Sequence, residues 1–172
     1  MNKPDLQKKL IALRSGDKAA FEEIYESLKT PMYTIILRVT RDKALSEDIL
    51  QEVFVKLYQS PPEPSVNPRA YLFQMARNLA IDGVRKQRHC ENLADIENIV
   101  YLPTEDLTMK MDVEDALKTL PLLDSQIVTL RINGELKFRE IAGMLNIPLG
   151  TVLWKYRESI KRLRLHLSGG TV

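Results

Sequence analysis

Apolar residues recur at helical spacing through most of this 172-residue chain. In the first half, three stretches show the period: 17–39, 43–59 and 68–88. Asp17 suits the N-cap of the first stretch, and Pro31 is expected to kink or restart the helix within that stretch. The proline-rich segment 60–68 must end the second stretch. Signals for β-strands are scarce, because turn dipeptides between alternating β-branched runs are missing. The pattern therefore predicts an α-helical bundle.

Helical periodicity returns after residue 112. Two further helices are expected between there and residue 136. The stretches 113–120 and 127–130 carry the apolar positions. Asn133 and Gly134 are typical of a helix end. The C-terminal part is therefore also predicted to be α-helical.

Residues 137–164 combine a short helix, a tight turn and a longer basic helix. The short helix is expected over 138–145, and Asn146 tolerates the left-handed backbone that such corners often demand. A new helix should begin near Leu149. This order predicts a helix-turn-helix. The apolar stripe of the second helix consists of Val152, Tyr156, Ile160, Leu163 and Leu167.

The remaining surface of that second helix is polar and mostly basic. Its first turns can enter a DNA groove, and its later cations can hold phosphates. An amphipathic helix with a merely solvated basic side is the other interpretation, but the preceding helix and turn favour DNA binding. The residues on this surface are Trp154, Lys155, Arg157, Glu158, Lys161, Arg162 and Arg164.

The formal net charge of +2 hides a division into three blocks. Residues 1–88 hold 15 Lys and Arg against 11 Asp and Glu, residues 89–112 hold one against six, and residues 113–172 hold nine against six. We therefore expect an all-α protein of two small helical bundles, 1–89 and 113–172, which an acidic flexible linker at 90–112 joins.

Composition argues against several classes of protein. No apolar run approaches the roughly 20 residues that span a bilayer, and the N-terminus lacks a signal-peptide pattern, so a cytoplasmic protein without membrane insertion is expected. One cysteine and two histidines exclude an internal disulfide and a structural zinc site. Without a glycine-rich phosphate loop or a metal cluster, neither catalysis nor a cofactor is expected.

Several segments together resemble the extracytoplasmic-function class of bacterial sigma factors. In the N-terminal part these are AFEEIY, LSEDILQEVFVKLYQ at 45–59 and NPRAYLFQMARNLAIDGVRKQRH at 67–89. In the C-terminal part it is LPLLDSQIVTLRINGELKFREIAGMLNIPLGTV at 120–152. Their order, their spacing and the acidic segment between them make the combination specific, and it covers nearly the whole chain.

The resemblance implies a transcription initiation factor that binds core RNA polymerase and promoter DNA, opens the element near −10 and reads the element near −35. The outward polar positions of 45–59 would face the polymerase clamp: Asp48, Gln51, Glu52 and Lys56. The −10 element would meet Asn67, Arg69, Tyr71, Arg77, Asn78, Arg85, Lys86 and Arg88. The −35 element would meet Thr151, Trp154, Lys155, Arg157, Glu158, Lys161 and Arg162.

Physical chemistry fits these roles and leaves two alternatives open. Cations can follow phosphates, and an aromatic ring such as that of Tyr71 can stack on an unpaired base. Many relatives carry tryptophan at that position, and a tyrosine packed in the core is the alternative. Trp154 can pack on sugar and thymine methyl groups, or it can fill the core between the helices.

The resemblance also implies a partner, and a second function stays open. Family members are commonly held inactive by a dedicated anti-sigma protein, so an anti-sigma partner is expected. The alternative is a helix-turn-helix transcriptional regulator that has no role in polymerase specificity. Such a repressor has no need of Asp48, Gln51 and Glu52 or of the basic helix after them, which favours the sigma factor.

Overall fold

The computed structural model describes residues 1, 3–63, 67–91, 116–117 and 119–167. All regular secondary structure in these ranges is α-helical, as predicted. Most of the predicted acidic linker lies outside the described residues, as do residues 113–115 and 118 of the helix expected at 113–120. The long helices are α1 (Lys3–Arg14), α2 (Lys18–Thr40), α3 (Lys43–Gln59), α4 (Pro68–Glu91), α6 (Leu122–Ile132), α7 (Phe138–Leu145) and α8 (Leu149–Leu167).

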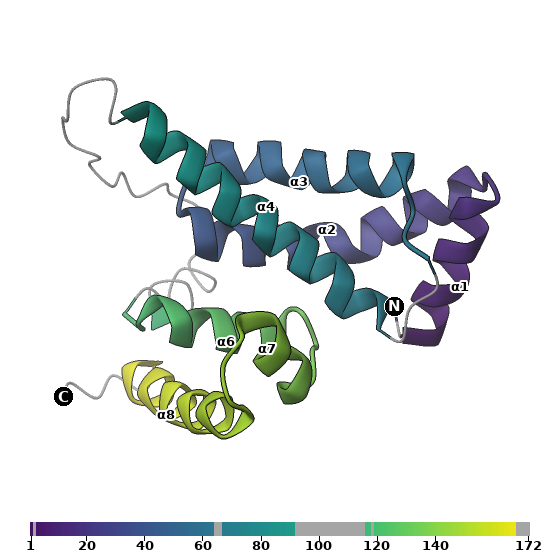
Figure 1. Ribbon diagram of the computed structural model, residues 1–172. Helices are drawn as coiled ribbons and strands as arrows, with labels where there is room; N and C mark the ends of the chain where they lie inside the picture. Colours follow the sequence, from purple (N-terminus) through teal and green to yellow (C-terminus); the bar gives the residue numbers. More distant parts are fainter. Residues whose placement is uncertain (2, 64–66, 92–115, 118, 168–172) are drawn as a thin grey trace.

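The N-terminal part is built around α2, which packs against α1, α3 and α4 (Figure 1). Asp17 caps α2 as predicted, because its Oδ1 accepts the backbone N–H of Ala19 at 2.9 Å and of Ala20 at 3.3 Å. The bounds of α3 match the predicted stretch, and α4 continues to Glu91, beyond the predicted end.

The sequence did not predict α1. This helix has little amphipathic contrast overall, yet it buries Leu6, Leu10 and Leu13 almost completely. Those three leucines follow one another at spacings of four and three residues, which places them on one face of the helix. Burial of this face against α2 stabilises a helix whose remaining residues are mostly polar.

The helix-turn-helix forms as predicted. Asn146 adopts the left-handed conformation, with φ 54° and ψ 46°, between α7 and α8. In α8 the predicted stripe buries Val152 and Leu163, but Leu167 is 50% exposed. The stripe therefore reaches the core through Val152 and Leu163, and its last residue, Leu167, is exposed at the C-terminal end of α8.

The N-terminal and C-terminal parts lie against each other. α6 packs on α2, and Figure 1 shows α6, α7 and α8 below α2 and α4. One continuous apolar core includes Ile35 and Ile36 of α2 together with Ile127 and Leu130 of α6. Both predicted groups of helices are therefore present, and they share part of their core. No helix within the described ranges is long and apolar enough to cross a bilayer.

Candidate nucleic-acid interface

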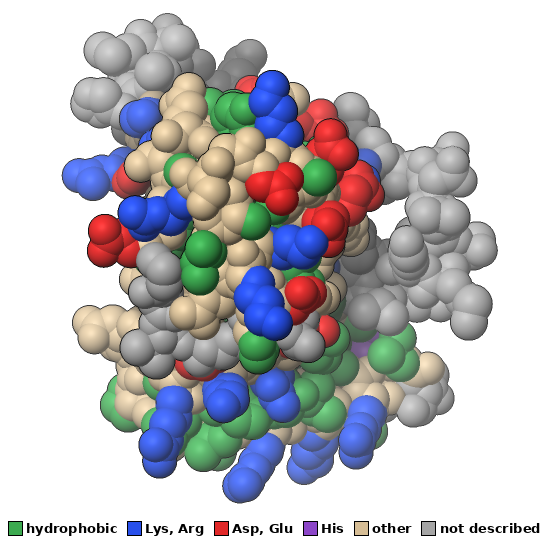
Figure 2. Space-filling view, turned by 90° about the vertical axis from the view of Figure 1, so that its right-hand side faces the viewer, with side chains coloured by type: hydrophobic (Ala, Val, Ile, Leu, Met, Phe, Trp, Pro, Cys, Tyr) green, Lys and Arg blue, Asp and Glu red, His purple; other side chains and the backbone are tan. Residues whose placement is uncertain are grey.

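α8 presents a basic surface to solvent. Arg157, Lys161 and Arg162 are exposed, and Thr151 and Glu158 are half-buried on the same helix. Figure 2 shows Lys and Arg side chains in a row along the lower edge of the molecule, where the C-terminal helices lie, with apolar side chains between them. Cations beside apolar surface on the second helix of a helix-turn-helix are suited to a DNA backbone and groove.

Trp154 belongs to this surface and not to the core. Its side chain is 61% exposed, so the alternative that it fills the space between the helices is wrong. The ring lies beside a cation, because the Nζ of Lys155 is 5.8 Å from the ring centroid. An exposed indole on the second helix of a helix-turn-helix is suited to contact a base edge or a sugar.

Lys155 is tied to α6. Its Nζ donates to Oδ1 of Asp124 at 2.6 Å, and the side chains are 22% and 8% exposed. The pair joins α6 to α8 and compensates the buried carboxylate. The sequence did not reveal Asp124, because 31 residues separate it from its partner. Lys155 is therefore a structural cation as well as a candidate for DNA contact.

The candidate residues on α4 divide into exposed and covered groups. Asn78, Arg85 and Lys86 are exposed, and Tyr71 is 50% exposed, so the alternative of a core tyrosine is wrong. Asn67 caps the helix, since its Oδ1 accepts the N–H of Ala70 at 3.2 Å. The side chain of Arg88 lies outside the described residues.

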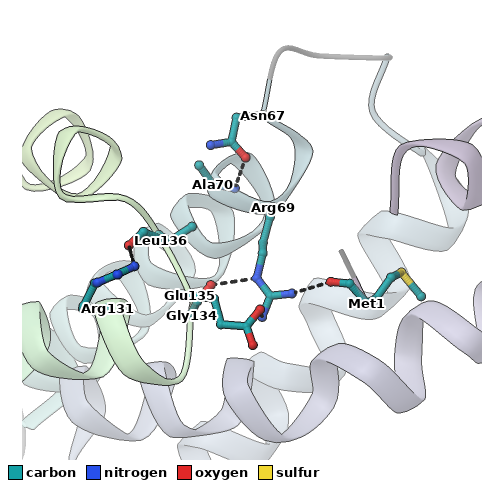
Figure 3. Close-up of polar contacts among 8 residues, drawn as sticks. All are labelled: Met1, Asn67, Arg69, Ala70, Arg131, Gly134, Glu135 and Leu136. Atoms are coloured by element: carbon teal, nitrogen blue, oxygen red, sulfur yellow. Dashed lines mark hydrogen bonds and ion pairs between the residues drawn. The ribbon is translucent and has the colours of Figure 1, made fainter. Parts of the chain in front are cut away.

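Arg69 is covered by the C-terminal part and is only 9% exposed (Figure 3). Its Nε donates to the carbonyl oxygen of Gly134 at 2.7 Å, and its Nη1 donates to that of Met1 at 3.1 Å. Its Nη2 lies 3.2 Å from Oε2 of Glu135. Burial lowers the pKa of the Arg69 guanidinium, and the Glu135 carboxylate opposes that shift.

The turn that meets Arg69 has a specific backbone. A Cβ at Gly134 would lie 2.5 Å from the carbonyl oxygen of Leu130, so only glycine fits there. Glu135 has a positive φ of 54°. Arg131 holds the turn from within, because its Nη1 donates to the carbonyl oxygen of Leu136 at 3.0 Å. The turn thus presents the Gly134 carbonyl to α4.

Arg77 is the second covered cation of α4. Burial lowers the pKa of its guanidinium. Its Nε is buried and makes no hydrogen bond within the described ranges. It lines a gap between α2, α4 and α6 that leaves no room for a water molecule. The C-terminal part therefore covers Arg77 in part and covers Arg69 almost completely.

α3 carries a different kind of surface. The predicted residues Asp48, Gln51 and Glu52 are exposed, and Lys56 forms an ion pair with Glu52 at 2.9 Å. Val55, at 50% exposed, follows Gln51 by four residues and therefore lies beside it on the helix surface. An exposed apolar group among polar ones on a helix face is suited to a protein partner, with the apolar group in the centre and the polar groups at the rim.

Aromatic residues that the sequence analysis did not select extend this face. Tyr58 is 46% exposed and Tyr25 of α2 is 37% exposed. Phe21 joins them, with its ring centroid 5.1 Å from that of Tyr58 and 6.4 Å from that of Tyr25. Tyr58 could have been predicted on this face from the sequence, because it follows Gln51 at helical spacing. Tyr25 could not, because only the packing of α2 on α3 brings it to this face.

Two family profiles match the chain. One described as Sigma-70 region 2 matches residues 24–90, and one described as Sigma-70, region 4 matches residues 110–153.

Within the described residues, no group of three or more His, Cys, Asp and Glu side chains is arranged to hold a metal ion.

Curated relatives match over nearly their whole lengths. The chain is 32% identical to "ECF RNA polymerase sigma factor SigM" of Bacillus subtilis (strain 168), over 83% of this chain and 93% of the relative. It is 29% identical to "ECF RNA polymerase sigma factor SigW" of the same organism, over 94% of this chain and 96% of the relative.

Solved structures share the fold. One is the sigma factor RpoE in complex with the anti-sigma factor NepR from Bartonella quintana, with a TM-score of 0.65 and 19% identity over 86% of this chain and 96% of that chain. Another is CnrH in complex with the cytosolic domain of CnrY, with a TM-score of 0.66 and 17% identity over 97% of this chain and 99% of that chain.

Proposed function

This chain belongs to the family of ECF RNA polymerase sigma factors, which direct promoter recognition, and we propose that it divides this work among α8, α4 and α3. The observation that carries the proposal is the exposed Trp154 on α8 with Arg157, Lys161 and Arg162 around it. These cations belong to the second helix of a complete helix-turn-helix.

α8 reads the −35 element in this proposal. Trp154 and Arg157 meet base edges or sugars, while Lys161 and Arg162 hold phosphates further along the helix. Thr151 and Glu158 lie on the same helix, and a carboxylate such as that of Glu158 can accept a hydrogen bond from cytosine N4. Lys155 contributes to the −35 contact from its place beside Asp124.

α4 binds the −10 element in its single-stranded form. Asn78, Arg85 and Lys86 are exposed to follow the backbone, and Arg88 extends the same helix. Tyr71 is half-exposed and stacks on a base that has left the duplex. Arg69 and Arg77 join them when the C-terminal part moves away, and Asn67 lies at the start of the helix.

α3 binds core RNA polymerase. Asp48, Gln51, Glu52 and Lys56 supply polar contacts, and Val55 between them supplies apolar area. The region 2 match covers this helix. A helix-turn-helix regulator that does not bind polymerase would have no need of a region 2 segment. That regulator is therefore the less favoured alternative. The domains in this proposal are 1–89, for polymerase and −10 DNA, and 113–172, for −35 DNA, with 90–112 as linker.

An anti-sigma protein is a proposed partner. The two solved structures that share the fold are sigma factors in complex with NepR and with the cytosolic domain of CnrY. The protein acts in the cytoplasm, where its polymerase is, and it catalyses no reaction itself. Polymerase carries out RNA synthesis, and this chain supplies promoter selection.

In vitro transcription tests this function. Purified core RNA polymerase transcribes a genomic fragment library with and without the protein, and the RNA starts are sequenced. New starts that share upstream elements near −35 and −10 are expected. Absence of new starts together with absence of binding to core polymerase contradicts the proposal and supports the repressor.

A further inference from the structure

Lys155 differs from the other cations of α8 in the face of the helix on which it stands. It follows the buried Val152 by three residues and precedes the buried Ser159 by four, so it lies on the covered side of α8. Trp154 and Arg157 stand three residues apart on the exposed side. The helical register therefore separates Lys155 from the residues that are available to DNA.

The ammonium group of Lys155 lies between a carboxylate and an aromatic ring. Its Nζ donates to Oδ1 of Asp124 at 2.6 Å, and the Asp124 side chain is 8% exposed. The same Nζ is 5.8 Å from the centroid of the Trp154 ring, which is within the range of a cation–π contact. A chain of contacts thus runs from α6 through Lys155 to the exposed indole.

Apolar packing joins α6 and α8 at a second place. Val128 of α6 and Leu163 of α8 belong to one buried cluster. Val128 lies about one turn after Asp124, and Leu163 lies about two turns after Lys155. A single contact lets two helices pivot, whereas two contacts along their lengths fix how one helix is rotated on the other. The ion pair therefore affects the direction in which α8 presents its exposed side.

We propose that Asp124 is a positioning residue for −35 recognition, which acts through Lys155 to fix the Trp154 ring and the rotation of α8. The inference rests on the proposed role of α8 in reading the −35 element. Asp124 itself touches no DNA in this arrangement. Its effect is on discrimination between DNA sequences, because contacts to base edges need a fixed orientation, whereas a flexible cation binds any phosphate.

Asp124 also lies in the first turn of α6, where the helix dipole favours a carboxylate. A residue that acted only there would stabilise the protein without affecting discrimination. Its loss would lower binding to every duplex by the same factor, through a smaller folded fraction. The ratio of the affinities for two duplexes therefore separates a positioning role from a stabilising one.

Asp124→Asn is the first variant. The amide keeps the size of the side chain and removes the charge that holds the Lys155 ammonium. The Lys155 side chain is 22% exposed, so it can turn toward solvent and add one cation to those that DNA meets.

Asp124→Asn with Lys155→Met is the second variant. It removes both charges and keeps an unbranched side chain at position 155. No unpaired ion is then left between the helices, so the protein is expected to stay folded without the ion pair. Its urea midpoint should lie near that of the parent.

The experiment uses the full chain and two duplexes of roughly 20 base pairs, which is about two turns of DNA. One duplex has the sequence that the parent protein selects from a random pool, and the other has a shuffled sequence of the same composition. Anisotropy of a dye on the DNA gives both affinities at several salt concentrations. The ratio of the affinities measures discrimination, and their salt dependence measures the phosphate contacts.

Asp124→Asn is expected to lower the affinity ratio at least about fivefold, because the selected duplex loses base contacts while the shuffled duplex gains a phosphate contact. The plot of log affinity against log salt should be steeper by about one. The double variant should lose discrimination to the same extent but keep the salt dependence of the parent. Glu22→Gln makes the same change of charge as Asp124→Asn at an exposed position of α2 and should match the parent in both quantities.

Trp154 reports its own positioning, because it is the single tryptophan of the chain. Time-resolved anisotropy of its emission measures how freely the ring moves on the nanosecond scale. In the free protein, Asp124→Asn and the double variant should both lose more anisotropy through fast local motion than the parent. Lys161→Met removes an exposed cation of the same helix and should leave this motion unchanged.

Three results overturn the inference. An affinity ratio that Asp124→Asn leaves unchanged removes the role in discrimination, and equal weakening on both duplexes assigns Asp124 to stability alone. Salt dependence that is shallower by about one in the double variant than in the parent means that Lys155 itself holds a phosphate. Unchanged local motion of Trp154 in both variants removes the chain of contacts through Lys155.

Arg157→Ala separates these results from failure of the proposed function. A lower affinity ratio in Arg157→Ala retains α8 as the reading helix, whatever the effect of Asp124→Asn. A parent protein that selects no sequence, or an Arg157→Ala variant that keeps the affinity ratio of the parent, removes −35 reading by α8 and the inference with it.

Discussion

α4 and α8 both carry cations at several turns, but they differ in what the cations face. On α8, Arg157, Lys161 and Arg162 are exposed. On α4, Arg69 and Arg77 lie under the C-terminal part, while Arg85 and Lys86 are exposed. Two basic helices of one chain therefore differ in availability. A count of cations describes attraction to DNA, whereas burial decides which of them DNA can reach.

The largest expected effect concerns Lys155, the α8 cation that most resembles the covered ones of α4. Lys155→Ala leaves the Asp124 carboxylate buried without its partner, so we expect the free energy of unfolding to fall by about 2–3 kcal/mol. Urea unfolding measures it. Lys161→Ala, at an exposed position of the same helix, is the control, with an expected change below about 0.5 kcal/mol. Equal small losses in both variants contradict a structural role for Lys155.

The exposed cations of α8 provide the second test. Arg157→Ala with Lys161→Ala should weaken binding of −35 duplex DNA about tenfold and lower the salt dependence, because two phosphate or base contacts are lost. Binding is measured at several salt concentrations. Lys8→Ala with Lys18→Ala removes the same charge from exposed N-terminal positions and should change little. A similar loss in both double variants means that overall charge, and not α8, drives binding.

The exposed end of α4 sharpens the comparison further. Arg85→Ala with Lys86→Ala should weaken single-stranded DNA binding by roughly fivefold, because two contacts to the DNA backbone are lost. Binding of −35 duplex DNA should stay at the parent value, and the two DNA forms are compared by anisotropy. Loss of duplex binding to the same extent indicates that the two helices do not divide the promoter between them.

The smallest expected effect is on stability at the two exposed aromatic residues. Trp154→Ala and Tyr71→Ala should each change the free energy of unfolding by less than about 0.5 kcal/mol, because both side chains are at least half exposed. Urea unfolding checks this. Trp154 is the single tryptophan of the chain, so its fluorescence also reports duplex binding directly. An emission spectrum that duplex DNA leaves unchanged argues against contact at Trp154.

Local features of the sequence were sufficient for most of the helices. Asp17 caps α2, the bounds of α3 match the apolar pattern, and Asn146 takes the left-handed turn of the helix-turn-helix. Each of these depends on residues within a few positions of one another. α1 was missed although its three buried leucines stand at helical spacing, because most of its other positions are polar and the helix has little amphipathic contrast.

The candidate sites were predictable as residue types and helix faces. The polar positions of α3 are outward as expected, and so are Arg157, Lys161 and Arg162 of α8. Of the aromatic residues that extend the α3 face, Tyr58 could have been selected from its spacing to Gln51, whereas Phe21 and Tyr25 could not, because they come from another helix. Which residues of two helices share one surface depends on how the helices pack.

The sequence by itself determined the all-α class, the positions of most helices and the presence of a helix-turn-helix, because periodicity and capping are short-range properties. Only the tertiary structure decided which cations are available. Arg69 meets Gly134 across 65 positions of sequence, and Lys155 meets Asp124 across 31. Burial and pairing at such separations follow from how α6 packs on α2 and α8, which no local pattern encodes.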